Sequence, residues 1–158
     1  FGEIGSRLER YYITAARHPA VGACISNDDW GFKTQTLFSP PQMRKYVFPW
    51  HRRIVQAIHA GGVPAILHSC GHFERIIEDV IAGMAYDARH SYEDNILPVE
   101  ASFERYGARI AHLGGIDLDF ICRRSPEDHH WVGTSAFTFA YQAFASEAAF
   151  FRSGSTFL

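Results

Sequence analysis

Residues 65–71 read Ala-Ile-Leu-His-Ser-Cys-Gly, a short apolar run that ends in polar residues and a glycine. The apolar part is typical of a buried strand. Because side chains alternate between the two faces of a strand, His68 and Cys70 are predicted to point the same way. Gly71 then allows the backbone to turn. The run therefore predicts an imidazole and a thiol side by side at the C-terminal end of a strand, where α/β proteins place their sites.

Apolar runs and amphipathic segments alternate on both sides of this stretch. Strands are predicted at 20–25, 64–68, 84–88, 109–113 and 150–153, and helices at 3–17, 39–61 with a kink at Pro49, 73–82 and 96–106. This alternation predicts an α/β chain with a parallel sheet. Such units fit half to two-thirds of an eight-stranded barrel, which needs about 250 residues. A complete doubly wound sheet of five strands is the competing geometry.

Composition restricts the classes of protein to consider. The chain has 158 residues, of which 47% are hydrophobic and 20% charged, so we expect one globular domain over 1–158. A net charge of −2 gives no basic surface for nucleic acid or anionic lipid, and no apolar run reaches the roughly 18 residues of a membrane span. Three cysteines at wide spacing do not form a disulfide framework, which favours a reducing, cytoplasmic location.

Polar side chains follow several predicted strands: Asp28 and Asp29, Arg89 and His90, Glu93, and Asp117. The C-terminal ends of parallel strands share one edge, so these residues are predicted to gather there. Asp28, Asp29 and Glu93 are the candidate catalytic carboxylates, while the other three are candidates for substrate binding. Only one of the adjacent pair Asp28 and Asp29 can point into a barrel mouth, and the sequence does not choose between them. Glu93 has the alternative role of capping the next helix.

Five motifs follow one another along the chain: Asn27-Asp28-Asp29-Trp30-Gly31, Leu37-Phe38-Ser39-Pro40, His68-Ser69-Cys70-Gly71, Ser91-Tyr92-Glu93-Asp94 and Gly114-Gly115-Ile116-Asp117. In this order they resemble the uroporphyrinogen decarboxylase superfamily. The resemblance covers roughly residues 1 to 128. That superfamily includes the porphyrin decarboxylase and the corrinoid-dependent methyltransferases, all on a (β/α)8 barrel. The resemblance implies a TIM barrel of which this chain is the C-terminal half to two-thirds.

The His-X-Cys element is more similar to the methyltransferase branch, which holds zinc with such a pair and a distant cysteine. The resemblance therefore implies zinc on His68 and Cys70, where it would bind a thiol as thiolate. The region 152–155, Arg-Ser-Gly-Ser, matches the place of the family's second cysteine and contains none. Cys24 falls in a predicted strand and Cys122 follows the last motif, and neither is well placed. The third ligand is open between a carboxylate and a residue outside this chain.

The resemblance leaves three functions open. The first is a methyltransferase that moves a methyl group between a corrinoid or methylated small molecule and a thiol. The second is a cofactor-free uroporphyrinogen decarboxylase, in which Asp28 or Asp29 stabilises protonated pyrrole nitrogens and Arg89 binds acetate groups. The third is a non-catalytic fragment that needs missing strands or a partner. The expected partners are a small-molecule or tetrapyrrole substrate, a corrinoid protein and, as an open alternative, a second copy in a homodimer.

Overall fold

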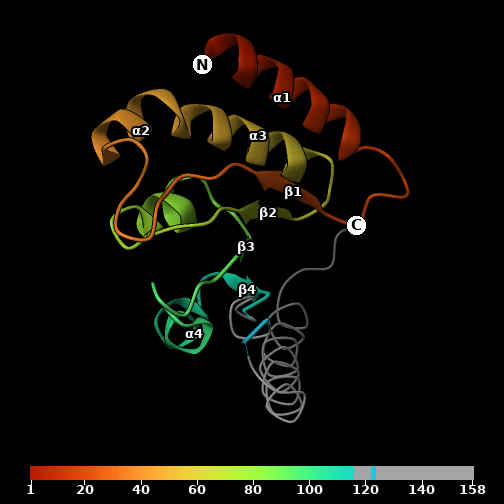
Figure 1. The fold of residues 1–158 in the computed structure, drawn as a ribbon. Coiled ribbons are helices and arrows are strands. Elements are labelled where there is room, and N and C mark those ends of the chain that lie inside the picture. The colour runs from red at the N-terminus through yellow and green to blue at the C-terminus, as the bar shows by residue number, and fades with distance from the viewer. Residues whose placement is uncertain (116–121, 124–158) are drawn as a thin grey trace.

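A computed structural model describes residues 1–115 and 122–123. The elements alternate along the chain (Figure 1). They are α1 (Gly2–Ala15), β1 (Cys24–Asn27), α2 (Pro40–Tyr46), α3 (Phe48–Ala60), β2 (Ala65–His68), the π-helical turn η1 (Asp79–Gly83), β3 (Ala88–His90), α4 (Val99–Tyr106) and β4 (Ala111–Leu113). Asp117 and the strand predicted at 150–153 lie outside the described residues.

The strands of the described part form one parallel sheet in the order β1-β2-β3-β4. The fold is therefore α/β, with each strand beside its neighbour in sequence, as the alternation of the sequence predicts. In the register of the sheet, Asn27 pairs with His68, His68 with His90, and His90 with Leu113. These four residues form a row across the C-terminal ends of the strands, and the polar loops begin there.

Prolines set two of the helix boundaries. The helix predicted from 39 to 61 is two helices in the structure, α2 and α3, which meet at Val47, and Pro49 lies in the first turn of α3. Proline suits that position, because a backbone N–H in the first turn of a helix would have no acceptor within the helix. At α4, Pro98 is the N-cap, so the helix starts at Val99 and not at 96 as predicted. The residue before a proline is disfavoured in the α region, which accounts for the later start.

Two strand predictions were displaced toward the N-terminus. The first strand begins at Cys24, four residues after the predicted start, and β3 occupies Ala88–His90 instead of 84–88. Ala85 has a φ of +60°, which no strand accommodates. The apolar side chains of Met84 and Tyr86 are nevertheless buried, because this loop packs against the core. Met84 and Tyr86 therefore belong to the hydrophobic core, although most of the segment 84–88 is not a strand.

The core lies between the sheet and the helices that cover one of its faces. Figure 1 shows α1 over α3, and α3 over β1 and β2. Ile54 and Ile58 of α3 are buried with Ala65 and Leu67 of β2, and all four are at most 1% exposed. On the opposite face of the sheet, Ile25 is 48% exposed. Among residues 1–115 and 122–123, no helix combines the length and apolarity needed to cross a bilayer.

Candidate functional site

Three potential metal ligands come together where β1 and β2 end. Asp29, His68 and Cys70 each offer one ligand atom, and these atoms all lie within 4.8 Å of one another. The Nε2 atom of His68 lies 4.0 Å from Oδ1 of Asp29, and the same oxygen accepts a hydrogen bond from the backbone N–H of Cys70 at 3.1 Å. We call these residues the Asp29–His68–Cys70 cluster. It contains both residues that the sequence predicts as zinc ligands, together with a carboxylate.

Two glycines hold the loops that carry this cluster against each other. Gly71 has a φ of +95°, and a Cβ added to it would lie 2.3 Å from the backbone carbon of Gly31. The loop after β2 therefore touches the loop after β1 backbone to backbone, which only glycine permits. Cys70 directly precedes Gly71, and Asp29 lies two residues before Gly31. Their proximity follows from this contact.

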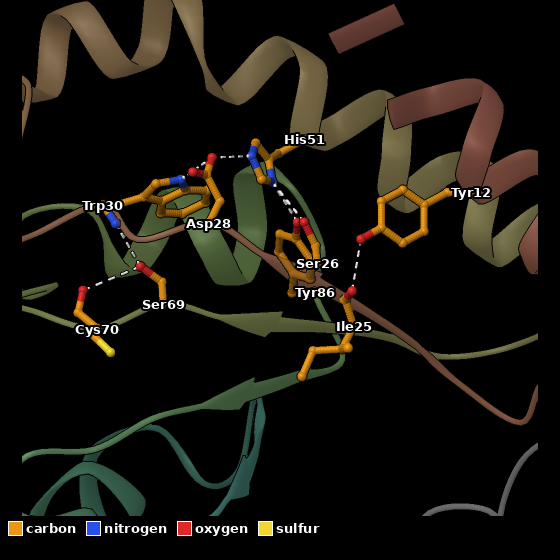
Figure 2. A network of polar contacts seen from close by, with 9 residues as sticks. All are labelled: Tyr12, Ile25, Ser26, Asp28, Trp30, His51, Ser69, Cys70 and Tyr86. Atoms are coloured by element: carbon orange, nitrogen blue, oxygen red, sulfur yellow. Dashed lines mark hydrogen bonds and ion pairs between the residues drawn. The ribbon is translucent and has the colours of Figure 1, made fainter. Parts of the chain in front are cut away.

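Asp28 contacts Trp30 and His51 rather than the cluster (Figure 2). Its Oδ2 atom accepts hydrogen bonds from Nε1 of Trp30 at 2.8 Å and from Nε2 of His51 at 3.1 Å. Burial raises the pKa of Asp28, but the hydrogen bonds from His51 and Trp30 outweigh it, so the pKa lies below its ordinary value. Of the adjacent carboxylates, Asp29 joins the cluster and Asp28 is held ionised beside α3.

The contacts of Asp28 continue into the core through His51, which is 4% exposed. Since a carboxylate only accepts, His51 donates from Nε2, and its Nδ1 is left to accept the hydroxyl of Tyr86 at 2.7 Å. Burial raises the pKa of Tyr86, which keeps this hydroxyl protonated as a donor. Sequence analysis did not select His51 or Tyr86. The sequence did contain one signal for His51: it lies four residues after Val47 and three before Ile54, so this histidine occupies a position on the apolar face of the helix.

The other described candidates differ in whether they contact the cluster or its loop. His90 adjoins the cluster, with its Nδ1 atom 2.6 Å from Nδ1 of His68 and the two rings stacked. The carboxylate of Glu93 accepts the backbone N–H of Gly71 at 3.3 Å. Arg89 points to the helix-covered face, where its guanidinium lies 4.1 Å from the ring centre of Phe73 and burial lowers its pKa. The structure thus places His90 and Glu93 near the cluster, and Arg89 away from it.

The buried hydrogen bonds of His51 lead to the first testable prediction. We expect His51→Leu to lower the free energy of unfolding by about 1–3 kcal/mol, because the Tyr86 hydroxyl loses its acceptor and Asp28 loses a donor. Urea denaturation measures this change. His59→Leu is the control: His59 also pairs with an aspartate, Asp87, but the pair is half-exposed and is worth at most about 1 kcal/mol. Equal losses in the two variants would contradict a structural role for the buried network.

Comparison with known proteins bears on the resemblance stated from the motifs. The family model described as Uroporphyrinogen decarboxylase (URO-D) matches residues 10–130, which is more than half of the chain. Searches of curated proteins and of solved structures found no match. The matched range includes every residue of the Asp29–His68–Cys70 cluster and its neighbours His90 and Glu93. The family match confirms the resemblance, and the chain belongs to the uroporphyrinogen decarboxylase superfamily.

Proposed function

We propose that this chain carries the thiol-activating part of a methyltransferase, which moves a methyl group from a corrinoid or a methylated small molecule to a thiol. Members of the superfamily are generally enzymes. The observation that supports this activity is the Asp29–His68–Cys70 cluster, which offers one nitrogen, one sulfur and one carboxylate oxygen within reach of a single ion. Zinc takes these three ligand types, and its catalytic sites use three protein ligands with one position open.

The donor set of the cluster fits zinc better than the hard cations. Mg²⁺ and Ca²⁺ take oxygen ligands, whereas a thiolate with an imidazole selects zinc or another transition metal. Asp29 supplies the carboxylate that the sequence left open as the third ligand. Zinc bound by these residues would lower the pKa of a bound thiol, so that the thiolate nucleophile exists at neutral pH.

Residues around the cluster hold its ligands in place. The backbone N–H of Cys70 fixes Asp29, and the Ser91 hydroxyl lies 3.2 Å from the sulfur of Cys70. His68 and His90 meet through their Nδ1 atoms at 2.6 Å, a distance at which one of the two nitrogens carries the shared hydrogen. When His68 donates it, Nε2 of His68 keeps a lone pair toward Asp29 and a metal ion. His90 is then a positioning residue that selects the metal-binding tautomer of His68.

This role of His90 gives the second prediction. We expect His90→Ala to weaken zinc binding by about 10- to 100-fold, the effect typical of removing the outer hydrogen-bond partner of a ligating histidine. Competition with a chromophoric chelator measures the affinity. His59→Ala is the control, because His59 lies on α3 and pairs with Asp87 outside the cluster. If His90→Ala bound zinc as tightly as the unaltered protein, His90 would have no part in orienting His68.

We also propose that the four parallel strands are part of a (β/α)8 barrel. The sequential order β1-β2-β3-β4 supports this, since neighbouring strands of that barrel are consecutive in the chain. Further support comes from the sheet face opposite α3, where Ile25 is exposed and Ile66 is half-buried. In a closed barrel such side chains fill the interior. The cluster would then lie at the C-terminal mouth, where barrel enzymes have their active sites.

The test of the proposed activity combines metal analysis with methyl transfer. The purified protein should contain one zinc per chain and should methylate a thiol from a methylcorrinoid, with loss of activity on chelation and recovery on adding zinc. Mass spectrometry of the thiol product measures the transfer. Full activity in a metal-free preparation would overturn the proposal. Turnover of uroporphyrinogen by metal-free protein would instead support the cofactor-free decarboxylase.

A further inference from the structure

A cavity of about 250 Å³ lies beside the cluster, between α1, the loop after β1 and the helices α2 and α3. Its wall is mostly apolar and aromatic, with side chains that include Phe1, Leu8, Phe38, Tyr46 and Trp50. Of these, Phe1, Leu8, Phe38 and Tyr46 are more than 40% exposed. Single exposed apolar side chains are common on protein surfaces, but a contiguous group of them around a cavity is typical of a binding site. The volume is just below that of pockets for drug-sized ligands, so it suits a smaller molecule.

The acidic side chains that line this cavity are Asp28 and Asp29. His51 also lines it, and no lysine or arginine side chain lines it among the described residues. Within residues 1–115 and 122–123, both hydrogen bonds of the Asp28 carboxylate end on Oδ2, and half of the side chain is exposed. In Figure 2 the carboxylate lies between Trp30 and His51. Its Oδ1 atom therefore remains available as an acceptor for a ligand.

The carboxylates and the aromatic wall of the cavity favour some classes of ligand over others. In the metal-free protein, an anion such as a carboxylate or phosphate would meet two carboxylates. Lys45 and Arg53, which lie over the rings of Tyr46 and Trp50 at 5.0 and 4.7 Å, do not line the cavity. A neutral apolar molecule would cover the ionised Asp28 and remove it from water without replacing its solvation, which is costly. A cation with apolar substituents satisfies both parts of the cavity, because aromatic faces and a carboxylate each attract it.

We propose that this cavity binds a small organic ammonium ion with apolar substituents, whose charge lies against Asp28 and whose substituents contact the aromatic wall. The aromatic group at the rim is already assembled, with Phe1 stacked on Tyr46 at 5.7 Å between ring centres and edge-on to Phe38 at 6.2 Å. The proposal goes beyond the methyltransferase activity and does not depend on zinc at His68 and Cys70. Asp29 belongs to both sites, so an ammonium ion bound here lies next to the metal cluster.

The test compares two molecules of the same shape. Choline carries a quaternary nitrogen, and 3,3-dimethyl-1-butanol has a carbon in its place. Each is titrated into the full chain with a metal chelator present, and tryptophan fluorescence reports binding because Trp30 and Trp50 line the cavity. We expect saturable binding of choline and at least ~10-fold weaker binding of the neutral analogue. Equal affinities, or no saturable response to either compound, would overturn the proposal. The chelator separates this result from any failure of the zinc site.

Three variants locate the binding. Asp28→Asn keeps the shape and removes the charge, and we expect choline affinity to fall at least ~10-fold. Phe38→Ala removes an exposed rim ring, so it tests the aromatic wall without relying on the core; a loss of several-fold is expected. Glu104→Gln removes an exposed carboxylate on α4 and should leave choline binding unchanged. Unchanged binding in both Asp28→Asn and Phe38→Ala, with folding verified by circular dichroism, would exclude this cavity as the ammonium site.

Discussion

Replacing Cys70 with alanine is expected to weaken zinc binding by about 100-fold or more. A structural zinc ion with four ligands binds with about 10–16 kcal/mol at neutral pH, so one ligand carries roughly 3 kcal/mol, which is about 100-fold in affinity. The true loss should be at the high end, because Cys70 supplies the only thiolate of the Asp29–His68–Cys70 cluster. His68 and Asp29 alone would leave zinc with one imidazole and one carboxylate.

Chelator competition measures this loss, and Cys122→Ala is the matched control. Cys122 is exposed and does not belong to the cluster, so its removal should leave the zinc affinity unchanged. Cys24 is a poorer control because it is buried, and alanine there would leave a small cavity. Wild-type affinity in Cys70→Ala would show that this sulfur does not bind the metal. Cys70 is half-buried, so we expect Cys70→Ala to stay folded, and thermal denaturation checks this.

The period-two rule was enough to predict two of the three residues of the cluster. It predicts His68 and Cys70 on one face of a strand from residues 65–71 alone. In the structure β2 ends at His68, but burial still alternates, with Leu67 and Ser69 fully buried and His68 and Cys70 half-buried. The gathering of polar residues at strand ends also follows from parallel topology. What local rules could not decide was the choice between Asp28 and Asp29. That choice depends on the turn after β1, and a contact with Gly71, 40 residues later, sets the turn.

The residues that sequence analysis missed or displaced were those whose environment is tertiary. His51 looks like an interruption of an apolar stripe until Asp28 and Tyr86 are brought to it from other elements. The strand β3 contains Arg89 and His90, which have no strand-like pattern. Arg89 is buried there because the rings of Phe73 and Tyr92 lie against its guanidinium, at 4.1 and 4.5 Å. Hydrophobic periodicity contains no information about such contacts.

Substitution of Gly71 is expected to have the largest effect on stability and site together. We expect Gly71→Ala to lower the free energy of unfolding by about 2–5 kcal/mol. Part of this is the strain of a left-handed conformation in alanine, about 1–2 kcal/mol. The rest is steric, since the new Cβ would lie 2.3 Å from the backbone carbon of Gly31, and a backbone cannot rotate away as a side chain can.

Gly62→Ala is the control that separates the two causes. Gly62 has a φ of +81°, but a Cβ there would meet nothing within 4 Å, so only the conformational strain of about 1–2 kcal/mol is expected. Urea denaturation of both variants measures the difference. If Gly71→Ala were no less stable than Gly62→Ala, the contact between the two loops would not be as close as the structure has it.

The same pair of variants tests whether the loop contact positions the metal ligands. Relief of the clash in Gly71→Ala requires the loops after β1 and β2 to separate, which would break the 3.1 Å hydrogen bond from the Cys70 amide to Asp29. Under conditions where both variants remain folded, we therefore expect weakened zinc binding in Gly71→Ala and wild-type binding in Gly62→Ala. Wild-type zinc affinity in a folded but destabilised Gly71→Ala would mean that His68 and Cys70 hold the metal without Asp29. The cluster would then need its third ligand from another part of the protein.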